Sequence, residues 1–281
     1  MVISEALQQA TLRLQSAGIE SPRLDAEVLL AFLLKKERLY LVLHRDETLS
    51  HEVETQFFSL VRRRADCEPV AYLLGEREFM SLPFFVEPGV LIPRPDTETL
   101  VECVLSRYSS SQALSILDLC TGSGAIAVSL AHYLPKSHVT ACDVSPLCLK
   151  VAHKNAENNG VSERITLKQW DVLAPCPFAE RFDCIVSNPP YIPSSVLCTL
   201  DRDVRDYEPA LALDGGDDGL LFYRRLIALA PSLLKKGGLL AFEVGHDQAD
   251  AVMAEMEENG FANCEKIKDL SGIFRVVCGR L

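Results

Sequence analysis

Apolar side chains recur every three to four positions through most of the first 75 residues, which is the spacing of amphipathic helices. Three such runs occupy positions 3–14, 24–33 and 53–61. Ser21-Pro22 precedes the second run and supplies a capping hydroxyl followed by a proline suited to a first helical turn. A further apolar segment ends at Gly75, a residue that commonly follows the last turn of a helix. We therefore predict a small helical domain over residues 1–75.

From about residue 96 onward, short continuous apolar runs alternate with longer amphipathic ones. The short runs predict strands at 115–119, 138–142, 165–167, 182–186 and 239–244. The longer runs predict helices at 125–133, 147–158, 220–234 and 248–259. Two final strands, at 264–267 and 274–277, are expected to form an antiparallel edge. This alternation predicts an α/β fold with a doubly wound, mostly parallel seven-stranded sheet.

Residues 76–95 fit neither pattern. Segments 77–80 and 84–86 are expected to pair as a short hairpin, and closely spaced prolines and a glycine then interrupt any regular element. We interpret 76–95 as a hairpin and linker between the helical domain at 1–75 and a larger domain at 96–281.

Composition and charge exclude several classes of protein. The 281 residues are 48% hydrophobic and 24% charged, as in a globular protein with a sizeable core. The net charge of −11 disfavours a broad surface that grips nucleic-acid phosphates. The chain has no signal-like start and no apolar stretch near the ~18 residues of a membrane span. We expect a cytoplasmic protein that binds neither membranes nor, stably, nucleic acid. Its 10 cysteines lack the spacing of a zinc site, so we expect reduced thiols and no metal.

A glycine turn supplies the first candidate site. The strand predicted at 115–119 is followed by Cys120-Thr121-Gly122-Ser123-Gly124 and then by a helix. The two glycines let the backbone turn sharply and approach a ligand closely. Asp143 ends the next predicted strand, where its carboxylate can accept hydrogen bonds from both hydroxyls of a ribose.

The turn is compatible with two cofactors. Gly122-x-Gly124-x-x-Ala127 satisfies the fingerprint of dinucleotide-binding proteins. Asp118, however, lies just before the turn, where a carboxylate would repel a pyrophosphate and attract the ammonium and sulfonium groups of S-adenosyl-L-methionine. We therefore favour S-adenosyl-L-methionine over a nicotinamide dinucleotide.

The second candidate site is the loop Asn188-Pro189-Pro190-Tyr191, which follows the strand predicted at 182–186. A residue that precedes a proline is driven into extended geometry, and the prolines stiffen the loop. The loop thus fixes one side-chain amide and two backbone carbonyls at the carboxyl end of a strand, where open α/β sheets bind ligands. Tyr191 adds a flat face for stacking.

Together the glycine turn and the Asn188 loop resemble class I S-adenosylmethionine-dependent methyltransferases that act on a planar nitrogen. Further segments are similar to the family that methylates the glutamine of peptide chain release factors, and the resemblance covers nearly the whole chain. These segments are 25–27, 68–75, 89–98, 207–216 and 242–245. Cys120 departs from the family, in which glycine is common at this position.

The resemblance implies a class I methyltransferase fold, S-adenosyl-L-methionine as cofactor and class 1 release factors as partners. It places Asp171 at the adenine amino group and Val172 against the adenine ring. The complete set of cofactor-binding candidates is Asp118, Cys120, Thr121, Gly122, Ser123, Gly124, Asp143, Asp171, Val172 and Asn188. The catalytic and substrate-binding candidates are Asn188, Pro189, Pro190 and Tyr191.

The chemistry of the Asn188 loop suits an amide substrate. An amide nitrogen is a weak nucleophile, so alignment with the methyl donor matters more than deprotonation. The Asn188 side-chain oxygen and the Pro189 carbonyl can accept the two N–H bonds of a glutamine –NH₂ and favour positive charge on its nitrogen. Adenine N6 in DNA or RNA carries a similar –NH₂, so an adenine methyltransferase is the rival enzyme. A nicotinamide oxidoreductase or a silent binding module is the remaining alternative.

Overall fold

The computed structural model describes all residues from 1 to 281, and the chain divides into two compact units. The first, here called the helical unit, comprises Met1–Glu76 and the separate segment Asp201–Tyr207. The second, the sheet unit, comprises Arg77–Leu200 and Glu208–Leu281. The chain therefore leaves the sheet unit once, for seven residues, and then returns to it.

The helical unit is built from short helices around one apolar core. They are α1 (Ile3–Ser16), α2 (Pro22–Leu34), α3 (Arg38–Leu43), α4 (His51–Ala65), α5 (Val70–Leu74) and α9 (Arg202–Tyr207). The buried side chains include Leu7 and Leu14 of α1, Leu30 of α2 and Phe57 of α4, so the helical periodicity of the sequence corresponds to real core faces. The pattern missed α3, because Leu39, Val42 and Leu43 are exposed and mark no buried face.

The helical unit also contains a largely buried ion pair. Arg64 Nε of α4 contacts Asp25 Oδ2 of α2 at 2.7 Å, and the Ser21 hydroxyl donates to the other oxygen of Asp25 at 2.9 Å.

The Tyr207 hydroxyl donates to the Asp66 carbonyl at 2.9 Å and attaches α9 to the end of α4. The second segment of the unit is thus held by a specific polar contact.

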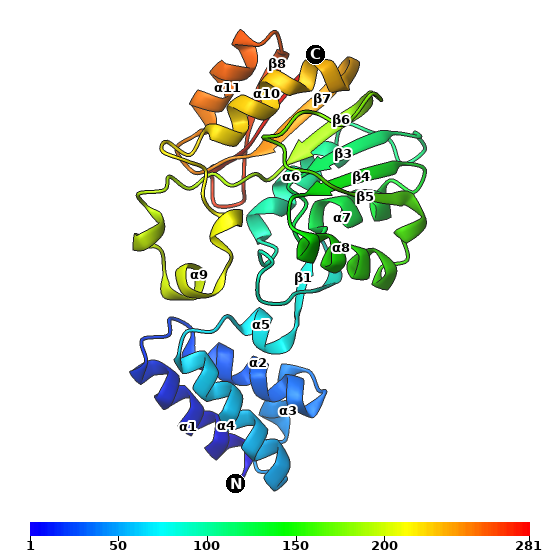
Figure 1. Ribbon diagram of the computed structural model, residues 1–281. Helices are drawn as coiled ribbons and strands as arrows, with labels where there is room; N and C mark the ends of the chain where they lie inside the picture. Colours follow the sequence, from blue (N-terminus) through cyan, green and yellow to red (C-terminus); the bar gives the residue numbers. More distant parts are fainter. The chain divides into compact units, whose positions relative to one another are not determined.

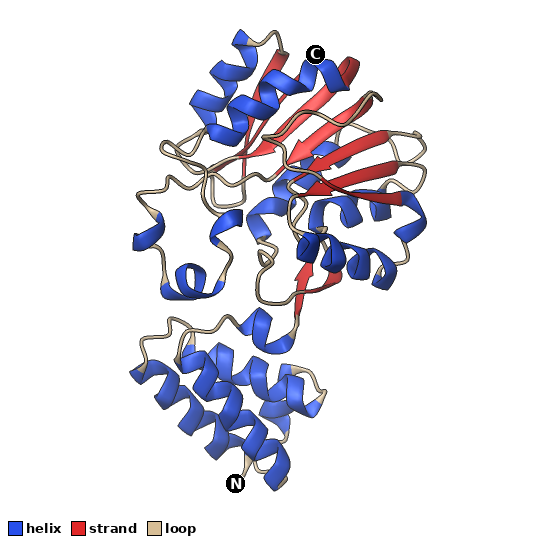
Figure 2. Ribbon diagram, viewed as in Figure 1, coloured by secondary structure: helices blue, strands red, loops and turns tan.

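The sheet unit is organised around seven strands (Figures 1 and 2). They are β3 (Ser115–Leu119), β4 (His138–Asp143), β5 (Ile165–Gln169), β6 (Phe182–Ser187), β7 (Leu234–Glu243), β8 (Ala262–Lys268) and β9 (Phe274–Arg280). Their order across the sheet is β5-β4-β3-β6-β7-β9-β8, and only the contacts made by β9 are antiparallel. The predicted seven-stranded, mostly parallel sheet with an antiparallel edge is confirmed.

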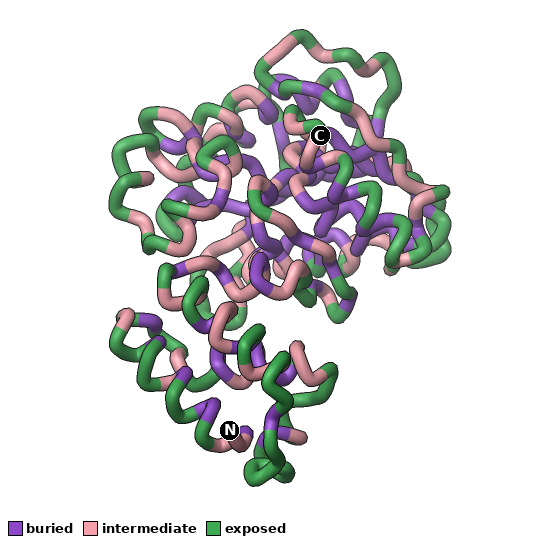
Figure 3. The backbone as a smooth tube through the Cα atoms, turned by 60° about the horizontal axis from the view of Figure 1, so that its bottom comes forward, coloured by how far each residue is buried: buried purple, intermediate pink, exposed green.

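Helices cover both faces of this sheet. One face carries α6 (Pro95–Leu105), α7 (Ala125–Tyr133) and α8 (Pro146–Asn158), and the other carries α10 (Leu221–Leu233) and α11 (Ala249–Glu258). Each face buries its own apolar cluster, so the inner strands are mostly buried, whereas the edge strands β5 and β8 contain no fully buried residue (Figure 3). Three short 3₁₀ helices complete the chain: η1 (Ser162–Arg164), η2 (Leu197–Thr199) and η3 (Ala210–Ala212).

The segment expected as a hairpin and linker is an integral part of the sheet unit from Arg77 onward. β1 (Glu76–Phe79) and β2 (Leu82–Phe85) form the hairpin, and Phe79 and Phe84 pack edge to face within the sheet unit's core. Val90 is buried in a separate small cluster with Cys148 and Val151 of α8. Helix α6, which the apolar pattern did not identify, then starts at Pro95, a proline in the first helical turn.

The strand order places a switch point beside β3. The chain proceeds from β3 to β4 and β5 on one side and then crosses to β6 on the other side of β3. Loops that follow β3 and β6 therefore diverge, and open α/β sheets bind ligands in the crevice this creates. The two predicted loops, Cys120–Gly124 and Asn188–Tyr191, follow these two strands.

Candidate active site

A cavity of about 200 Å³ lies at this end of the sheet. Seven of the predicted site residues line it: Cys120, Gly122, Asp143, Asp171, Val172, Asn188 and Pro190. Six others do not reach its wall: Asp118, Thr121, Ser123, Gly124, Pro189 and Tyr191. The structure thus brings residues from the loops after β3, β4, β5 and β6 to one cavity within the sheet unit.

The glycine turn has a left-handed backbone at three positions. The φ angles are +61° at Cys120, +56° at Gly122 and +80° at Gly124. A Cβ at Gly124 would lie 2.9 Å from the Cβ of Ala152 in α8, so this glycine permits the close approach of two helices. A Cβ at Gly122 would meet no protein atom, because this glycine faces open space. Cys120 adopts a left-handed conformation that favours glycine. A cysteine at this position therefore strains the backbone, because its Cβ is close to the following carbonyl oxygen.

Asp118 lies beneath the turn. Its side chain is fully buried, and Oδ2 accepts a hydrogen bond from the Thr121 hydroxyl at 2.6 Å. Oδ1 is buried without a hydrogen-bond partner. Burial raises the pKa of Asp118 to about 7, although the Thr121 contact opposes the rise. The side chain therefore holds the turn from inside, and it does not stand on the cavity wall as the sequence suggested.

Asp143 does stand on the wall, and the structure shows how it is oriented. One carboxylate oxygen accepts from the Gly122 backbone N–H at 2.9 Å, and the other accepts from the Ser145 N–H at 2.9 Å. An ionised carboxylate offers about four lone-pair sites, so these two bonds leave acceptor capacity for the hydroxyls of a ligand. Burial raises the pKa of Asp143, and hydrogen bonds from the backbone N–H groups of Ser145, Gly122 and Val144 and from the Cys148 thiol oppose that effect.

The loop after β5 forms a second wall. Asp171 accepts from the Leu173 N–H at 2.9 Å, which closes a tight turn. Arg225 of α10 donates to the carbonyls of Val172 at 2.9 Å and Ala174 at 2.7 Å. Trp170 also lines the cavity, although a single tryptophan in the sequence gave no reason to separate it from core residues.

The Asn188 loop is fixed from several sides. Ser187, the last residue of β6, donates from its hydroxyl to the Leu119 carbonyl of β3 at 2.6 Å. The side-chain amide nitrogen of Asn188 donates to the Thr97 hydroxyl of α6 at 3.1 Å. The carbonyl of Tyr191 accepts from the Gln248 side chain at 2.9 Å. Because the Asn188 nitrogen is bound on the side away from the cavity, its amide oxygen is left to accept a hydrogen bond.

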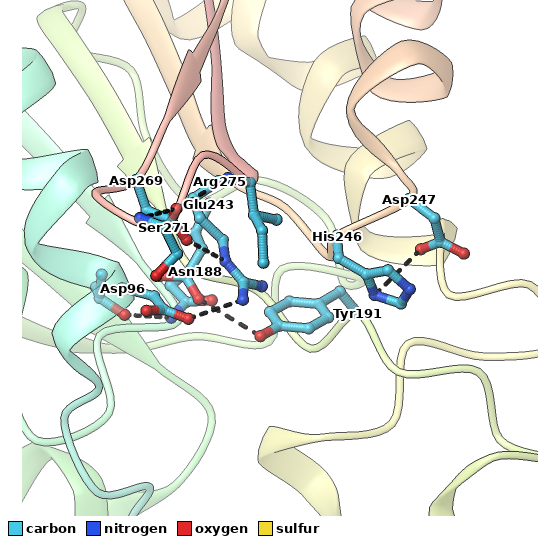
Figure 4. A network of polar contacts seen from close by, with 11 residues as sticks. Asp96, Asn188, Tyr191, Glu243, His246, Asp247, Asp269, Ser271 and Arg275 are labelled. Carbon is cyan, nitrogen blue, oxygen red and sulfur yellow. Dashed lines mark hydrogen bonds and ion pairs between the residues drawn. The ribbon is translucent and has the colours of Figure 1, made fainter.

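Behind this loop the Tyr191 hydroxyl points toward the carboxylate of Glu243, the last residue of β7, at 3.5 Å (Figure 4). Burial raises the pKa of the Tyr191 hydroxyl. The pKa of Glu243 is raised by burial to about 7. Glu243 lies within one of the segments that resemble the family, but the sequence offered no role for it.

The remaining wall comes from a segment for which the sequence suggested no contact. The cavity is also lined by Pro209, Leu211 and Ala212 of this segment and by Phe222 of α10. Buried Glu208 anchors this segment, because its carboxylate accepts from the Ile92 N–H at 3.1 Å and forms an ion pair with Arg94. These contacts join positions more than 100 residues apart in the chain, which no local pattern reveals.

No group of three or more histidine, cysteine, aspartate or glutamate side chains is arranged to hold a metal ion. None of the ten cysteines forms a disulfide bond. None of the helices has the length and apolar character that a membrane crossing requires.

Comparisons with known proteins agree with this arrangement. Residues 5–75 match the family described as PrmC N-terminal domain, and residues 94–198 match the family described as methyltransferase small domain. A release factor glutamine methyltransferase from Moorella thermoacetica is 50% identical over 252 residues, covering 90% of this chain and 88% of the relative. A protein of the same name from Clostridium acetobutylicum is 40% identical over 278 residues, covering 99% and 98%.

A solved methyltransferase from Pyrococcus furiosus superimposes with a TM-score of 0.54 at 20% identity and covers 78% of this chain and 98% of its own. At this level of identity the likeness concerns the fold alone.

Proposed function

Because the chain belongs to the release factor glutamine methyltransferase family, we propose that it methylates class 1 peptide chain release factors at the glutamine of their Gly-Gly-Gln loop, with S-adenosyl-L-methionine as methyl donor. The chain is a protein-(glutamine-N5) methyltransferase. The observation that carries the proposal is Asn188 at the cavity, with its amide nitrogen bound to Thr97 and its amide oxygen left to accept.

The cavity suits S-adenosyl-L-methionine in three respects. Gly122 leaves open space beside the turn, where a larger residue would project a side chain. Asp143 is oriented by backbone N–H groups and offers its remaining acceptor capacity to the ribose hydroxyls. Asp171, Val172 and Trp170 provide a carboxylate and apolar faces for the adenine. When bound, this cofactor supplies a methyl group on a positively charged sulfur, which makes the methyl carbon electrophilic.

The role of the protein is to align an amide that reacts poorly on its own. The Asn188 side-chain oxygen, on the cavity wall, accepts one N–H bond of the substrate –NH₂. The carbonyl of the next residue, Pro189, which does not line the cavity itself, is assigned the other N–H bond where the substrate enters, and the pair turns the nitrogen lone pair toward the methyl carbon. Both acceptors carry negative partial charge, and they favour the positive charge that develops on the nitrogen. With S-adenosyl-L-methionine bound, transfer would form the nitrogen–carbon bond as the carbon–sulfur bond breaks, with S-adenosylhomocysteine as the leaving group and one N–H proton passing to solvent.

Glutamine rather than a nucleobase is the acceptor in this proposal. The relatives are named for glutamine methylation of release factors, and the chain carries a net charge of −11. A protein that grips DNA or RNA phosphates generally presents clustered positive charge. Transfer to adenine remains an outcome that the experiment below distinguishes.

The Asn188→Ala variant tests the proposal. Loss of one preorganised polar group at a reacting centre typically lowers the rate by ~10²–10³. We expect this loss in methyl transfer to a purified release factor, with cofactor affinity changed only a few-fold, because Asn188 mainly orients the acceptor. Asn259→Ala, an amide residue at the end of α11 and outside the cavity, serves as the matched control. Wild-type rates in Asn188→Ala, or transfer to DNA or RNA by the wild-type chain, would contradict the proposal.

The helical unit, residues 1–75 in the sequence prediction, is proposed to recognise the protein substrate, because every residue of the cavity belongs to the sheet unit. A chain that begins at Arg77 should still bind S-adenosyl-L-methionine in a calorimeter. It should methylate an intact release factor at least about tenfold less well, a loss of 1.4 kcal/mol or more, yet treat a short Gly-Gly-Gln peptide much as the full chain does. Equal losses on protein and peptide would argue against the division of roles.

The proposed place of action is the cytoplasm. Release factors act at ribosomes, and ten cysteines without a disulfide bond suit a reducing compartment.

A further inference from the structure

Glu243 is a buried carboxylate without an ion-pair partner, directly behind the acceptor loop. Glu243 is 2% exposed, and its Oε2 atom has no hydrogen-bond partner. Burial of a carboxylate is costly unless charges or hydrogen bonds compensate for it. Nothing in the proposed function so far uses this residue, so its burial calls for another explanation.

The groups that face Glu243 come from four elements (Figure 4). Asp96 belongs to α6, Arg275 to β9 and Tyr191 to the loop after β6, and the Tyr223 hydroxyl of α10 donates to the backbone carbonyl of Glu243 at 2.8 Å. Arg275 forms no ion pair with Glu243, because its ion pairs are with Asp96 at 2.9 Å and with an aspartate in the β8–β9 turn at 3.1 Å, so its charge compensates that of Glu243 only in part. Glu243 therefore exerts its charge on the hydroxyls and the amide around it.

Two further neighbours of Glu243, Thr97 and Asn188, form a short chain of polar groups with it. The Asn188 nitrogen donates to the Thr97 hydroxyl at 3.1 Å, and both residues lie beside the Glu243 carboxyl. An ionised carboxylate accepts hydrogen bonds and donates none, so it attracts N–H and O–H groups and repels a carbonyl oxygen. If the Asn188 amide were rotated by 180°, its oxygen would face this negative charge.

We propose that Glu243, in its ionised form, is a positioning residue that holds the Asn188 amide with its nitrogen toward Thr97 and its oxygen toward the substrate. This inference rests on the proposed function, and it names a residue that sets the orientation of the Asn188 amide. The negative charge also lies on the side of Asn188 away from the cavity, where it favours positive charge on a methylated nitrogen. Thr97 is the intermediate link between the two side chains.

The protonation state of Glu243 provides the readout. Its pKa is raised to about 7, mainly by burial and in part by the charge of Asp96, although hydrogen bonds from Thr97 and Asn188 and the charge of Arg275 oppose the rise. The ionised form is required, so the rate of methyl transfer should fall as the pH drops through about 7. A protonated Glu243 can donate a hydrogen bond, and the preference for one orientation of the Asn188 amide is then lost.

The Glu243→Gln variant tests the role of the charge while preserving the shape of the side chain. With saturating cofactor and a release factor as substrate, we expect kcat above neutral pH to fall about 10–100-fold, by analogy with the loss found when the hydrogen-bond partner that orients a metal ligand is removed. The KM for cofactor should remain within a few-fold of wild type, and the variant should lack the fall in kcat below neutral pH that Glu243 causes. Glu258→Gln, at the exposed end of α11, is the matched control.

A second measurement does not depend on turnover. The side-chain amide signals of Asn188 in a nuclear magnetic resonance spectrum, identified by their absence from Asn188→Asp, should shift with a midpoint near pH 7 in the wild-type chain. Glu243→Gln should abolish this titration. Thr97→Val, which removes the linking hydroxyl, should weaken it and lower kcat, whereas Thr97→Ser should restore both. The Thr97 pair also covers the case in which Glu243→Gln does not fold.

The outcomes separate this inference from the function on which it rests. Wild-type kcat in Glu243→Gln or Thr97→Val, with an unchanged Asn188 titration, would overturn the positioning role. An Asn188 titration that follows Glu243 in a chain that transfers no methyl group to glutamine would refute the proposed function and leave the positioning role in place.

Discussion

Replacement of Asp143 by alanine should weaken cofactor binding. The carboxylate accepts the N–H groups of Gly122 and Ser145, each at 2.9 Å, and these bonds orient it while leaving acceptor capacity for a ligand. Each hydrogen bond from a ribose hydroxyl to this charged group is worth ~1.5–3 kcal/mol. Two such bonds give about 3–6 kcal/mol as an upper bound, since water partly replaces them.

Because each 1.4 kcal/mol corresponds to tenfold in affinity, Asp143→Ala should bind S-adenosyl-L-methionine at least about tenfold more weakly in a calorimeter. Asp143→Asn retains one acceptor oxygen, so its affinity should lie between those of alanine and wild type. Asp247→Ala removes an equal charge from an exposed position and should change little. An Asp143→Ala chain that unfolds like wild type and binds the cofactor equally well would refute the assigned ribose site.

Two further predictions concern stability. Cys120 has a φ of +61°, where a Cβ costs ~1–2 kcal/mol. Cys120→Gly should therefore be more stable to urea than Cys120→Ala by up to about 1 kcal/mol. Equal stabilities would mean that the turn is unstrained. Burial raises the pKa of Asp118 and that of Glu243 to about 7. The folded chain therefore binds these two protons more tightly than the unfolded chain does. The contribution of the two carboxyls to the free energy of unfolding falls as pH rises from about 4 to 7. Asp118→Asn should make this fall shallower by about 1.4 kcal/mol per pH unit in urea titrations, whereas an unchanged slope would argue against proton uptake at Asp118.

Most of the sheet unit could be predicted from the sequence, because strands buried on both faces appear as short apolar runs and their flanking helices as periodic ones. The errors fall where that signal is weak. Helix α9 has only six residues and buries no side chain of its own. The helix expected at 220–234 ends at Leu233, and β7 starts at Leu234, with a register shift before Leu239 that accommodates Gly237 at φ +77°.

The candidate site was predictable where residues follow the ends of neighbouring parallel strands. Cys120, Asp143 and Asn188 meet at one cavity for this reason. Asp118 was placed on the wall because β3 is buried on both faces, so no alternation shows to which side its carboxylate points. Thr97, Glu208 and Glu243 were missed because their contacts join distant parts of the chain, such as the 91 residues between Thr97 and Asn188.

The central claim is that Asn188 and its loop present a planar glutamine amide to the methyl donor. The most direct measurement is peptide mapping by mass spectrometry of a class 1 release factor after incubation with this chain and S-adenosyl-L-methionine. We predict one methyl group, on the side-chain nitrogen of the glutamine in the Gly-Gly-Gln loop, and none after that glutamine is changed to glutamate. A methyl group on a lysine, an arginine or a neighbouring residue, or continued methylation of the glutamate variant, would contradict the account.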